Sequence, residues 1–232
     1  MSTAFAYPSA IGRELLDDPG ADPALVAESL RNIARANRLL GGVAAARFGV
    51  TRLLAPPRPA LATLLDVGTG LGDVPRAVAT RLARLGTRLV VIGIDLNPTA
   101  TMLATERGVP TLRGDGLRLP LSDRSVDVVL LSQIAHHLSP EGVMRLATEA
   151  SRVARFGVVL SDLKRSRPAQ LGFRLAARLL RFDAATAADG ITSLQRGFRA
   201  PELRALLAEA GFQADCSHRL GSRVVAIWSS AT

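Results

Sequence analysis

The stretch Leu64-Leu65-Asp66-Val67-Gly68-Thr69-Gly70-Leu71-Gly72-Asp73 decides the fold of this chain. Its first part belongs to an apolar run, Leu61 to Val67, that predicts a buried strand. The run ends in three glycines at alternate positions, and a helical pattern follows them. Glycine lets the backbone turn sharply and leaves N–H groups bare against a ligand. The stretch therefore predicts a nucleotide-binding turn between a strand and a helix.

The residue that follows the third glycine indicates which nucleotide fits. A dinucleotide fingerprint reads G-x-G-x-x-G, and its last position, counted from Gly68, is Asp73 in this chain. A carboxylate there would repel a diphosphate. S-adenosylmethionine (SAM) carries a sulfonium and an ammonium group and no phosphate, so Asp73 favours SAM over a dinucleotide.

Composition limits the class of protein. With 232 residues and 48% apolar content, the chain suits one α/β domain with an appendage. A single cysteine, Cys216, excludes an internal disulfide and fits a reducing compartment, so we expect a cytoplasmic protein. We expect no transmembrane helix, because no run of 18 apolar residues occurs, and no secretory signal in Met1 to Ala10. The net charge is +9, but the arginines are scattered and aromatic residues make up only 4%, so we expect no nucleic-acid partner.

The order of patterns predicts two parts. Residues 1–60 predict an N-terminal helical cap, in which Asp22-Pro23 starts a helix that Gly41-Gly42 ends. A second helix is expected over 43–54, before a proline linker at 56–59. From residue 61 to 232, strands alternate with helices, which predicts a Rossmann-like sheet covered on both faces. The expected strands are 61–66, 88–94, 109–113, 126–131, 155–161, 212–218 and 222–229, and the expected helices are 72–85, 98–107, 140–153 and 200–210.

Segment 163–199 interrupts this alternation and is long for a connection. It predicts a helix over 168–182, with one stripe of leucines and another of arginines. Three interpretations are open: a helix packed on the domain, a lid over a substrate pocket, and a helix lying on a membrane surface. We take the segment as an insertion that serves as a substrate lid. The leucine stripe is Leu171, Leu175 and Leu179 with Phe182, and the basic stripe is Arg174, Arg178 and Arg181.

Two further carboxylates follow predicted strands. Asp95 ends the second strand, where a carboxylate can accept both hydroxyls of a ribose. The alternative role, capping the next helix, suits Asn97 better because Asn97 precedes Pro98. Asp115 stands between Gly114 and Gly116, in a turn that can approach a planar ring and accept a bond from its exocyclic amine. The alternative is an ordinary surface turn.

The order and spacing of these motifs over residues 60–162 resemble class I SAM-dependent methyltransferases. The resembling stretches are Leu64 to Asp73, Ile92 to Pro98, Gly114 to Asp123 and Ser125 to Val129. The resemblance implies an α/β fold with a seven-stranded, mostly parallel sheet of order 3-2-1-4-5-7-6 and an antiparallel last strand. It implies that SAM is the cofactor and S-adenosylhomocysteine (SAH) the product. Asp66 and the Gly68–Gly72 turn would hold the methionine end, Asp95 the ribose and Asp115 the adenine amine. The other expected cofactor-binding residues are Thr69, Gly70, Asp73, Leu96, Asn97, Gly114, Gly116, Ser132 and Gln133.

A narrower resemblance concerns the pathway. Several further stretches are similar to bacterial methyltransferases associated with type III polyketide synthases and with quinone or phenolic-lipid pathways. Those families act mainly on phenolic or quinol oxygens, which implies a small aromatic acceptor. The stretches are Arg13 to Asp18, Asn37 to Gly42, Gly72 to Pro75, Ser161 to Ser166, and Asp189-Gly190 through Arg196-Gly197-Phe198.

Two histidines follow the fourth strand, at the position that faces the transferred methyl group in this fold. A phenol has a pKa near 10, so His136 or His137 could accelerate the reaction as a base. The alternative is that one imidazole packs under the cofactor and the other caps a helix. At the end of the fifth strand, Asp162 and Arg165 could orient an acceptor or form a solvated turn. No His, Cys, Asp or Glu set has metal-ligand spacing, so we expect no metal.

We therefore expect a SAM-dependent methyltransferase, acting as a monomer or homodimer, that methylates an oxygen of a small hydrophobic or aromatic molecule. The N-terminal cap and segment 163–199 would enclose this acceptor. Carbon methylation of the kind found in quinone biosynthesis remains open. A non-catalytic SAM-binding protein and an NAD-dependent oxidoreductase are the alternatives from other classes.

Overall fold

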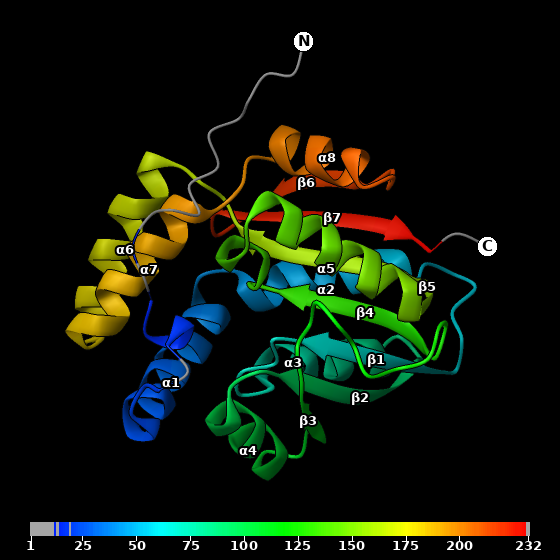
Figure 1. Ribbon diagram of the computed structural model, residues 1–232, viewed down its shortest axis with the longest axis horizontal. Helices are drawn as coiled ribbons and strands as arrows, with labels where there is room; N and C mark the ends of the chain where they lie inside the picture. Colours follow the sequence, from blue (N-terminus) through cyan, green and yellow to red (C-terminus); the bar gives the residue numbers. More distant parts are fainter. Residues whose placement is uncertain (1–11, 13, 19, 231–232) are drawn as a thin grey trace.

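Seven strands form one sheet in the computed structural model, which describes residues 12, 14–18 and 20–230 (Figure 1). Their order is β3-β2-β1-β4-β5-β7-β6, and β7 runs antiparallel to both of its neighbours. This confirms the predicted fold and strand order. The predictions for Met1 to Ala10 and for Arg13 lie outside the described residues. The strands are β1 (Leu61–Val67), β2 (Arg88–Asp95), β3 (Thr111–Arg113), β4 (Val126–Ser132), β5 (Ala154–Leu163), β6 (Asp215–Arg219) and β7 (Arg223–Ser229).

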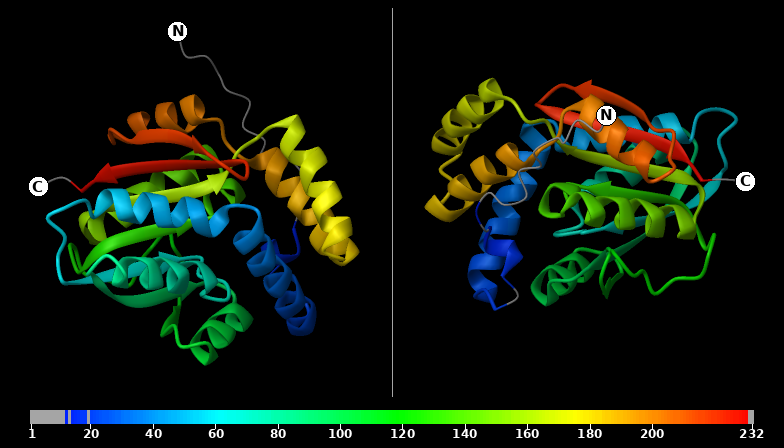
Figure 2. Two further views of the ribbon diagram at one scale, coloured as in Figure 1. Left: turned by 180° about the vertical axis from the view of Figure 1, so that it is seen from behind. Right: turned by 45° about the horizontal axis from the view of Figure 1, so that its top comes forward.

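Successive side chains of the central strands point to opposite faces of the sheet and pack into two separate hydrophobic clusters. Leu64 of β1 faces α2 (Gly42–Leu53) and α3 (Asp73–Ala83), while Leu65 faces α5 (Pro140–Val153) and α8 (Ala200–Glu209). Both leucines are fully buried, because a parallel strand in the middle of such a sheet has no solvated face. Figure 2 shows α2 and α3 across the face of the sheet that is turned away in Figure 1.

One part of the N-terminal region packs on the sheet, and the other part lines the cavity described below. Helix α1 (Pro23–Leu39) begins where the Asp22 carboxylate accepts bonds from two backbone N–H groups. Val26 and Leu30 of α1 pack against Leu71 of the glycine turn and Ala100 of α4 (Pro98–Glu106). Helix α2 lies within the predicted cap of residues 1–60, yet it packs directly on the sheet. Among the described residues of this region, α1 and the short 3-10 helix η2 (Leu15–Asp17) extend past the sheet edge (Figure 1).

Segment 163–199 forms two helices instead of the single helix predicted over 168–182. Helix α6 (Arg167–Leu179) fits that prediction, and α7 (Ala184–Arg196) follows it as an antiparallel partner. The α7 sequence has few large apolar residues and contains Gly190, so its pattern is weak. Its helix is supported instead by the Asp183 cap and by the Phe173 ring, which occupies the space where Gly190 lacks a side chain.

A search of the described residues for helices that are both long enough and apolar enough to cross a membrane finds none.

Candidate active site

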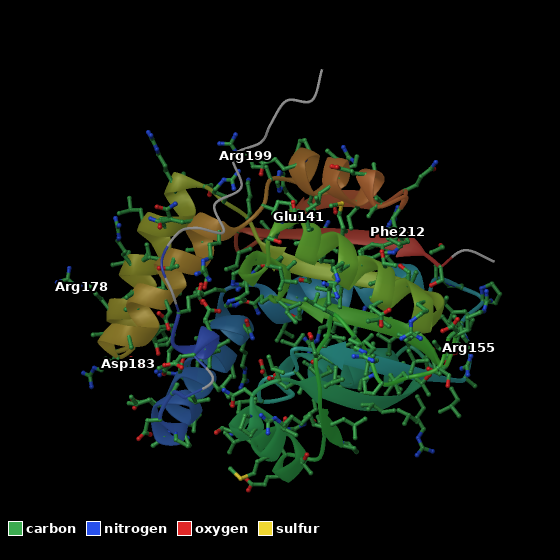
Figure 3. All side chains as sticks on the ribbon, in the orientation of Figure 1. Glu141, Arg155, Arg178, Asp183, Arg199 and Phe212 are labelled. Atoms are coloured by element: carbon green, nitrogen blue, oxygen red, sulfur yellow. The ribbon has the colours of Figure 1, made fainter. Side chains whose placement is uncertain are left out.

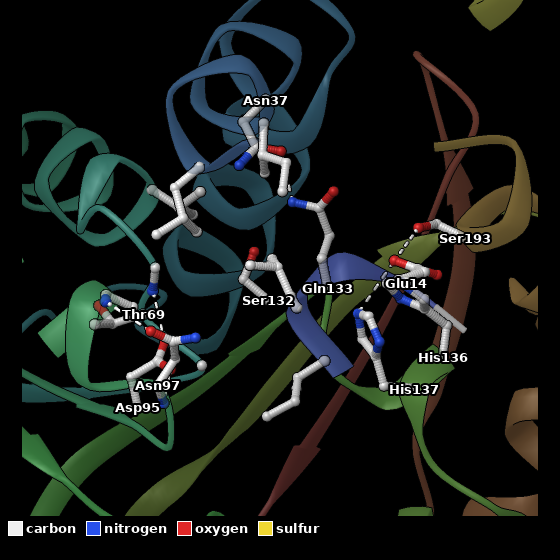
Figure 4. A pocket seen from close by; sticks show the side chains of 18 of the residues that line it. Glu14, Asn37, Thr69, Asp95, Asn97, Ser132, Gln133, His136, His137 and Ser193 are labelled. Atoms are coloured by element: carbon white, nitrogen blue, oxygen red, sulfur yellow. Dashed lines mark hydrogen bonds and ion pairs between the residues drawn. The ribbon is translucent and has the colours of Figure 1, made fainter. Parts of the chain in front are cut away.

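A cavity of about 660 Å³ opens at the carboxyl ends of the central parallel strands. Val67, Ile94 and Ser132 line it from β1, β2 and β4. Its other walls come from η2, α1, α6 and α7, which are far from these strands in sequence. Ligands of doubly wound sheets bind at this edge. Figure 4 shows the two ends of the cavity, with Asp95 and Thr69 at one end and His136, His137 and Glu14 at the other.

The glycine turn forms the first end. Gly68, Gly70 and Gly72 have φ values of 72°, 54° and 67°, a region that residues with a Cβ adopt at a cost. Asp95 holds this turn, because its Oδ2 accepts a bond from the Gly70 N–H at 2.9 Å and its Oδ1 accepts one from the Asn97 N–H at 2.9 Å. Asn97 caps α4, as expected from its position before a proline. Each oxygen of Asp95 thus keeps a lone pair for a ligand.

Three carboxylates gather at this end of the cavity. Burial, together with the neighbouring charges of Asp73 and Asp95, raises the pKa of Asp66 to about 8 against the opposing bond from the Thr69 hydroxyl. Burial also raises the pKa of Asp73 and of Asp95 above their usual range. Among the described residues, Asp66 Oδ1 and Ser132 Oγ are buried without a hydrogen-bond partner. Buried acceptors of this kind suit a ligand that brings positive charge and N–H donors.

The raised pKa of Asp66 predicts how stability depends on pH. The folded protein keeps the Asp66 proton up to about pH 8, while the unfolded chain loses it near pH 4. Folded stability therefore falls as pH rises between these values. Between pH 5.5 and pH 8 the loss is on the order of 3 kcal/mol, or roughly 5–10 °C in Tm for a domain of this size.

Asp66→Asn removes this titration and should leave a flatter pH dependence of Tm than the wild type has. Thermal unfolding of both proteins across this pH range measures the difference. Parallel profiles would show that Asp66 does not titrate there.

The remaining predicted cofactor residues lie around the same end. Gly114, Asp115 and Gly116 line the cavity after β3, as does the exposed Leu96. The Asp115 carboxylate is exposed and accepts a bond from the Leu117 N–H at 2.9 Å, as in a capped turn. Gln133 has a φ of 56° and lies between two partners: its amide donates to Asn37 of α1, and its Oε1 accepts from Arg223 of β7 at 2.7 Å. Gln133 therefore fastens α1 to the sheet edge above the cavity.

The two histidines at the other end have different surroundings. His136 is buried, and its Nδ1 lies 2.7 Å from Asp162 Oδ1, so Nε2 is the ring nitrogen available to a ligand in the cavity. Burial raises the pKa of Asp162, but the His136 ring and the Leu163 N–H outweigh it and hold that pKa below the usual range. A buried carboxylate that orients an imidazole is the arrangement of a general base and its positioning residue.

His137 pairs with the N-terminal segment instead. Its Nδ1 lies 2.8 Å from Asp17 Oδ1, and its Nε2 lies 3.9 Å from Glu14. Arg196 of α7 contacts both of these acids, at 3.2 Å from Glu14 and 3.1 Å from Asp17. Sequence spacing indicates no metal site, but the fold brings Glu14, His136 and His137 within 4.8 Å of one another. The centroids of the two imidazole rings lie 4.2 Å apart, and their planes are tilted by 36°.

Two residues predicted to contact the acceptor do not line the cavity. Asp162 lies behind His136. Arg165 turns to Glu202 of α8, where its Nη2 donates to both carboxylate oxygens at 2.6 and 2.7 Å, because this buried acid provides a charged partner that a solvated turn would lack. Several wall residues were not among the predicted site residues, although five of them lie within the narrower motifs. These residues are Glu14, Asp17, Asn37, Phe173, Phe182, Asp189, Ser193 and Arg223.

Comparisons with known proteins agree with this geometry. Residues 65–161 match a family model described as a methyltransferase domain. An uncharacterized methyltransferase of Mycobacterium bovis is 36% identical over 138 residues, which cover 56% of this chain and 51% of that protein. The chain thus spans about half the length of the curated relatives it matches.

Two solved structures illustrate the likeness in fold. A SAM-dependent methyltransferase from Aquifex aeolicus superposes with a TM-score of 0.62 at 19% identity, over 90% of this chain and 99% of that one. Human N-acetylserotonin methyltransferase, solved with SAM, gives a TM-score of 0.63 at 12% identity, over 91% of this chain and 57% of that one. Residues 65–161 are therefore similar to a methyltransferase domain, and the chain has the fold of SAM-dependent methyltransferases.

Proposed function

We propose that this chain is a SAM-dependent methyltransferase that methylates an oxygen of a small, apolar aromatic acceptor such as a phenol, quinol or polyketide. The observation that carries the proposal is that one cavity has an acidic glycine turn at one end and the His136–Asp162 pair at the other. Its volume, about 660 Å³, lies in the usual range for a small-molecule site.

The acidic end fits the cofactor. When bound, SAM supplies an activated methyl group on a positively charged sulfur. Asp66 and the glycine turn would hold its methionine end, Asp95 would accept its ribose hydroxyls, and Asp115 would accept its adenine amine. The partnerless Asp66 Oδ1 and the charges of Asp73 and Asp95 favour such a cation. The same charges disfavour the diphosphate of a nicotinamide cofactor.

The histidine end fits the acceptor. A phenolic hydroxyl is protonated at neutral pH, so the reaction gains from a base that removes its proton as the new O–CH₃ bond forms. His136 Nε2 would take that proton, and Asp162 would hold the ring in place and stabilise the charge that develops on it. Alignment of the two reactants in one enclosed site would lower the barrier further, by roughly 7–11 kcal/mol in well-oriented systems.

The wall on the acceptor side supports an apolar substrate. Leu16, Ile33, Leu138, Phe173 and Phe182 line the cavity there. The network of Glu14, Asp17, Arg196 and His137 ties the N-terminal segment to α7 at the wall of the cavity. We infer that this segment and α7 enclose the acceptor and exclude water. Monomeric or homodimeric assembly and a cytoplasmic location remain predictions.

Calorimetry with SAM, SAH and NADH tests the cofactor assignment. We expect SAM and SAH to bind and NADH not to bind. Binding of NADH without SAM would contradict the proposal and indicate a redox enzyme. A panel of phenols and quinols, assayed by SAH release and by NMR of the product, then tests the acceptor. A product methylated on a ring carbon would indicate carbon methylation. SAM binding without turnover of any acceptor would favour a non-catalytic SAM-binding protein.

A further inference from the structure

We propose that the outer face of α6 docks on an anionic lipid surface. The face carries three leucines, Leu171, Leu175 and Leu179, whose exposed fractions are 69%, 61% and 74%. They recur every four residues, so they form one continuous apolar row along the helix. Three large apolar side chains in one exposed row are unusual on a solvated helix, and such a row marks an interaction surface.

The opposite face of α6 already has its partners. Ala177 is buried, and the Phe173 ring packs into the space beside Gly190 of α7 and lines the cavity. The aromatic side of α6 therefore satisfies the helix–helix contact, and the leucine row is not needed for it. This differs from the expected stripe, in which Phe182 and the leucines share one face. Phe182 instead turns inward, near Phe173, and also lines the cavity.

The charges beside the leucine row indicate the chemistry of the partner. Arg167, Arg174 and Arg178 are exposed and lie in a second row next to the leucines at helical spacing. Figure 3 shows Arg178 directed away from the body of the protein. Helix α6 contains no Asp or Glu, and no ion pair of these three arginines occurs among the described residues. An apolar row flanked by arginines suits a helix lying flat on anionic headgroups.

A second copy of the chain fits this surface less well. Pairing two α6 helices through their leucines would bring the two arginine rows together, with no acid on either helix to offset them. An anionic lipid surface meets both rows at once. Docking would also bring the cavity wall that contains Phe173 and Phe182 close to the lipid. If the proposed function holds, a lipophilic acceptor could then enter from the bilayer, but the docking itself does not depend on methyl transfer.

Vesicle flotation tests this proposal with the whole chain. We expect the wild type to float with vesicles that contain phosphatidylglycerol and not with pure phosphatidylcholine vesicles. The triple variant L171Q/L175Q/L179Q should lose this binding. The variant R167Q/R174Q/R178Q should partition about 100-fold more weakly, since each Arg near an anionic surface is worth about 1 kcal/mol. Leu61→Gln, at an exposed leucine that begins β1 at the opposite end of the sheet, should bind as the wild type does.

Fold and cofactor binding serve as independent readouts, because every variant should keep the circular dichroism spectrum and SAH affinity of the wild type. The proposal is wrong if the wild type does not float with the anionic vesicles, or if the leucine variant floats equally well. It is also wrong if light scattering shows a wild-type dimer that the leucine variant lacks, since the face would then bind a second copy.

Discussion

Asp95→Ala should lower the affinity for SAH by roughly 10²–10⁴-fold. The reason is that the carboxylate acts on both sides of the cofactor site. It accepts hydrogen bonds from the Gly70 and Asn97 N–H groups, which fixes the glycine turn, and under the proposed function its remaining lone pairs would accept the two ribose hydroxyls. A hydrogen bond to a charged group contributes about 1.5–3 kcal/mol, and two such bonds to the ligand are lost. Calorimetry with SAH measures this effect without knowledge of the acceptor.

Asp115→Ala is the matched control for this experiment. Asp115 also lines the cavity, but its carboxylate is exposed and already accepts the Leu117 N–H. We therefore expect a loss of about tenfold or less, as for one solvated hydrogen bond. An Asp95→Ala protein that is folded and binds SAH as the wild type does would remove Asp95 from the cofactor site. Thermal unfolding of each variant shows whether the fold is kept.

His136→Gln should lower kcat by about 10²–10⁴-fold, the usual contribution of a general base. SAH affinity should change little, because the proposed role of His136 concerns the proton of the acceptor. Asp162→Asn should lower kcat as well, since under the proposed function Asp162 would position His136 through its 2.7 Å contact with Nδ1.

His137→Gln distinguishes the two neighbouring imidazoles. His137 pairs with Asp17 and lies near Glu14, outside the buried pair. Its loss should loosen the N-terminal segment, which would raise KM more than it lowers kcat. Equal losses of kcat in the two histidine variants would contradict the assignment of His136 as the base. Because His136 is buried, a wild-type Tm and SAH affinity are the required controls for its variant.

The strand–turn–helix at Leu64 to Asp73 made the fold predictable from the sequence. A buried parallel strand needs a continuous apolar run, and a turn with three left-handed positions needs glycine, so both features are local and visible. The same reasoning found the caps at Asp22 and Asn97, where a short polar side chain precedes a proline. Asp95 could be placed at the sheet edge because it directly follows the strand that the apolar run over 88–94 predicts.

Other parts of the site have no local pattern. His136 and Asp162 are 26 residues apart, and only the pairing of β4 with β5 brings them together. Glu14 and Arg196 are 182 residues apart, and their contact depends on how η2 packs beside α7. Helix α7 itself has a weak apolar pattern and is supported by contacts with Phe173, a residue of another helix. Tertiary contacts of this kind cannot be deduced from the spacing of residues along one segment.

Local sequence therefore determined the strands, the glycine turn, the helix caps and the acidic residues beside them. Tertiary structure alone decided that His136 pairs with Asp162 and His137 with Asp17, and that α2 packs on the sheet while η2 lines the cavity. It also decided that Arg165 turns away to Glu202 and that the α6 leucines remain exposed. The physical reason is the same in each case. Backbone geometry and burial of a single segment depend on that segment's own residues, whereas ion pairs and exposed faces depend on which distant segments meet.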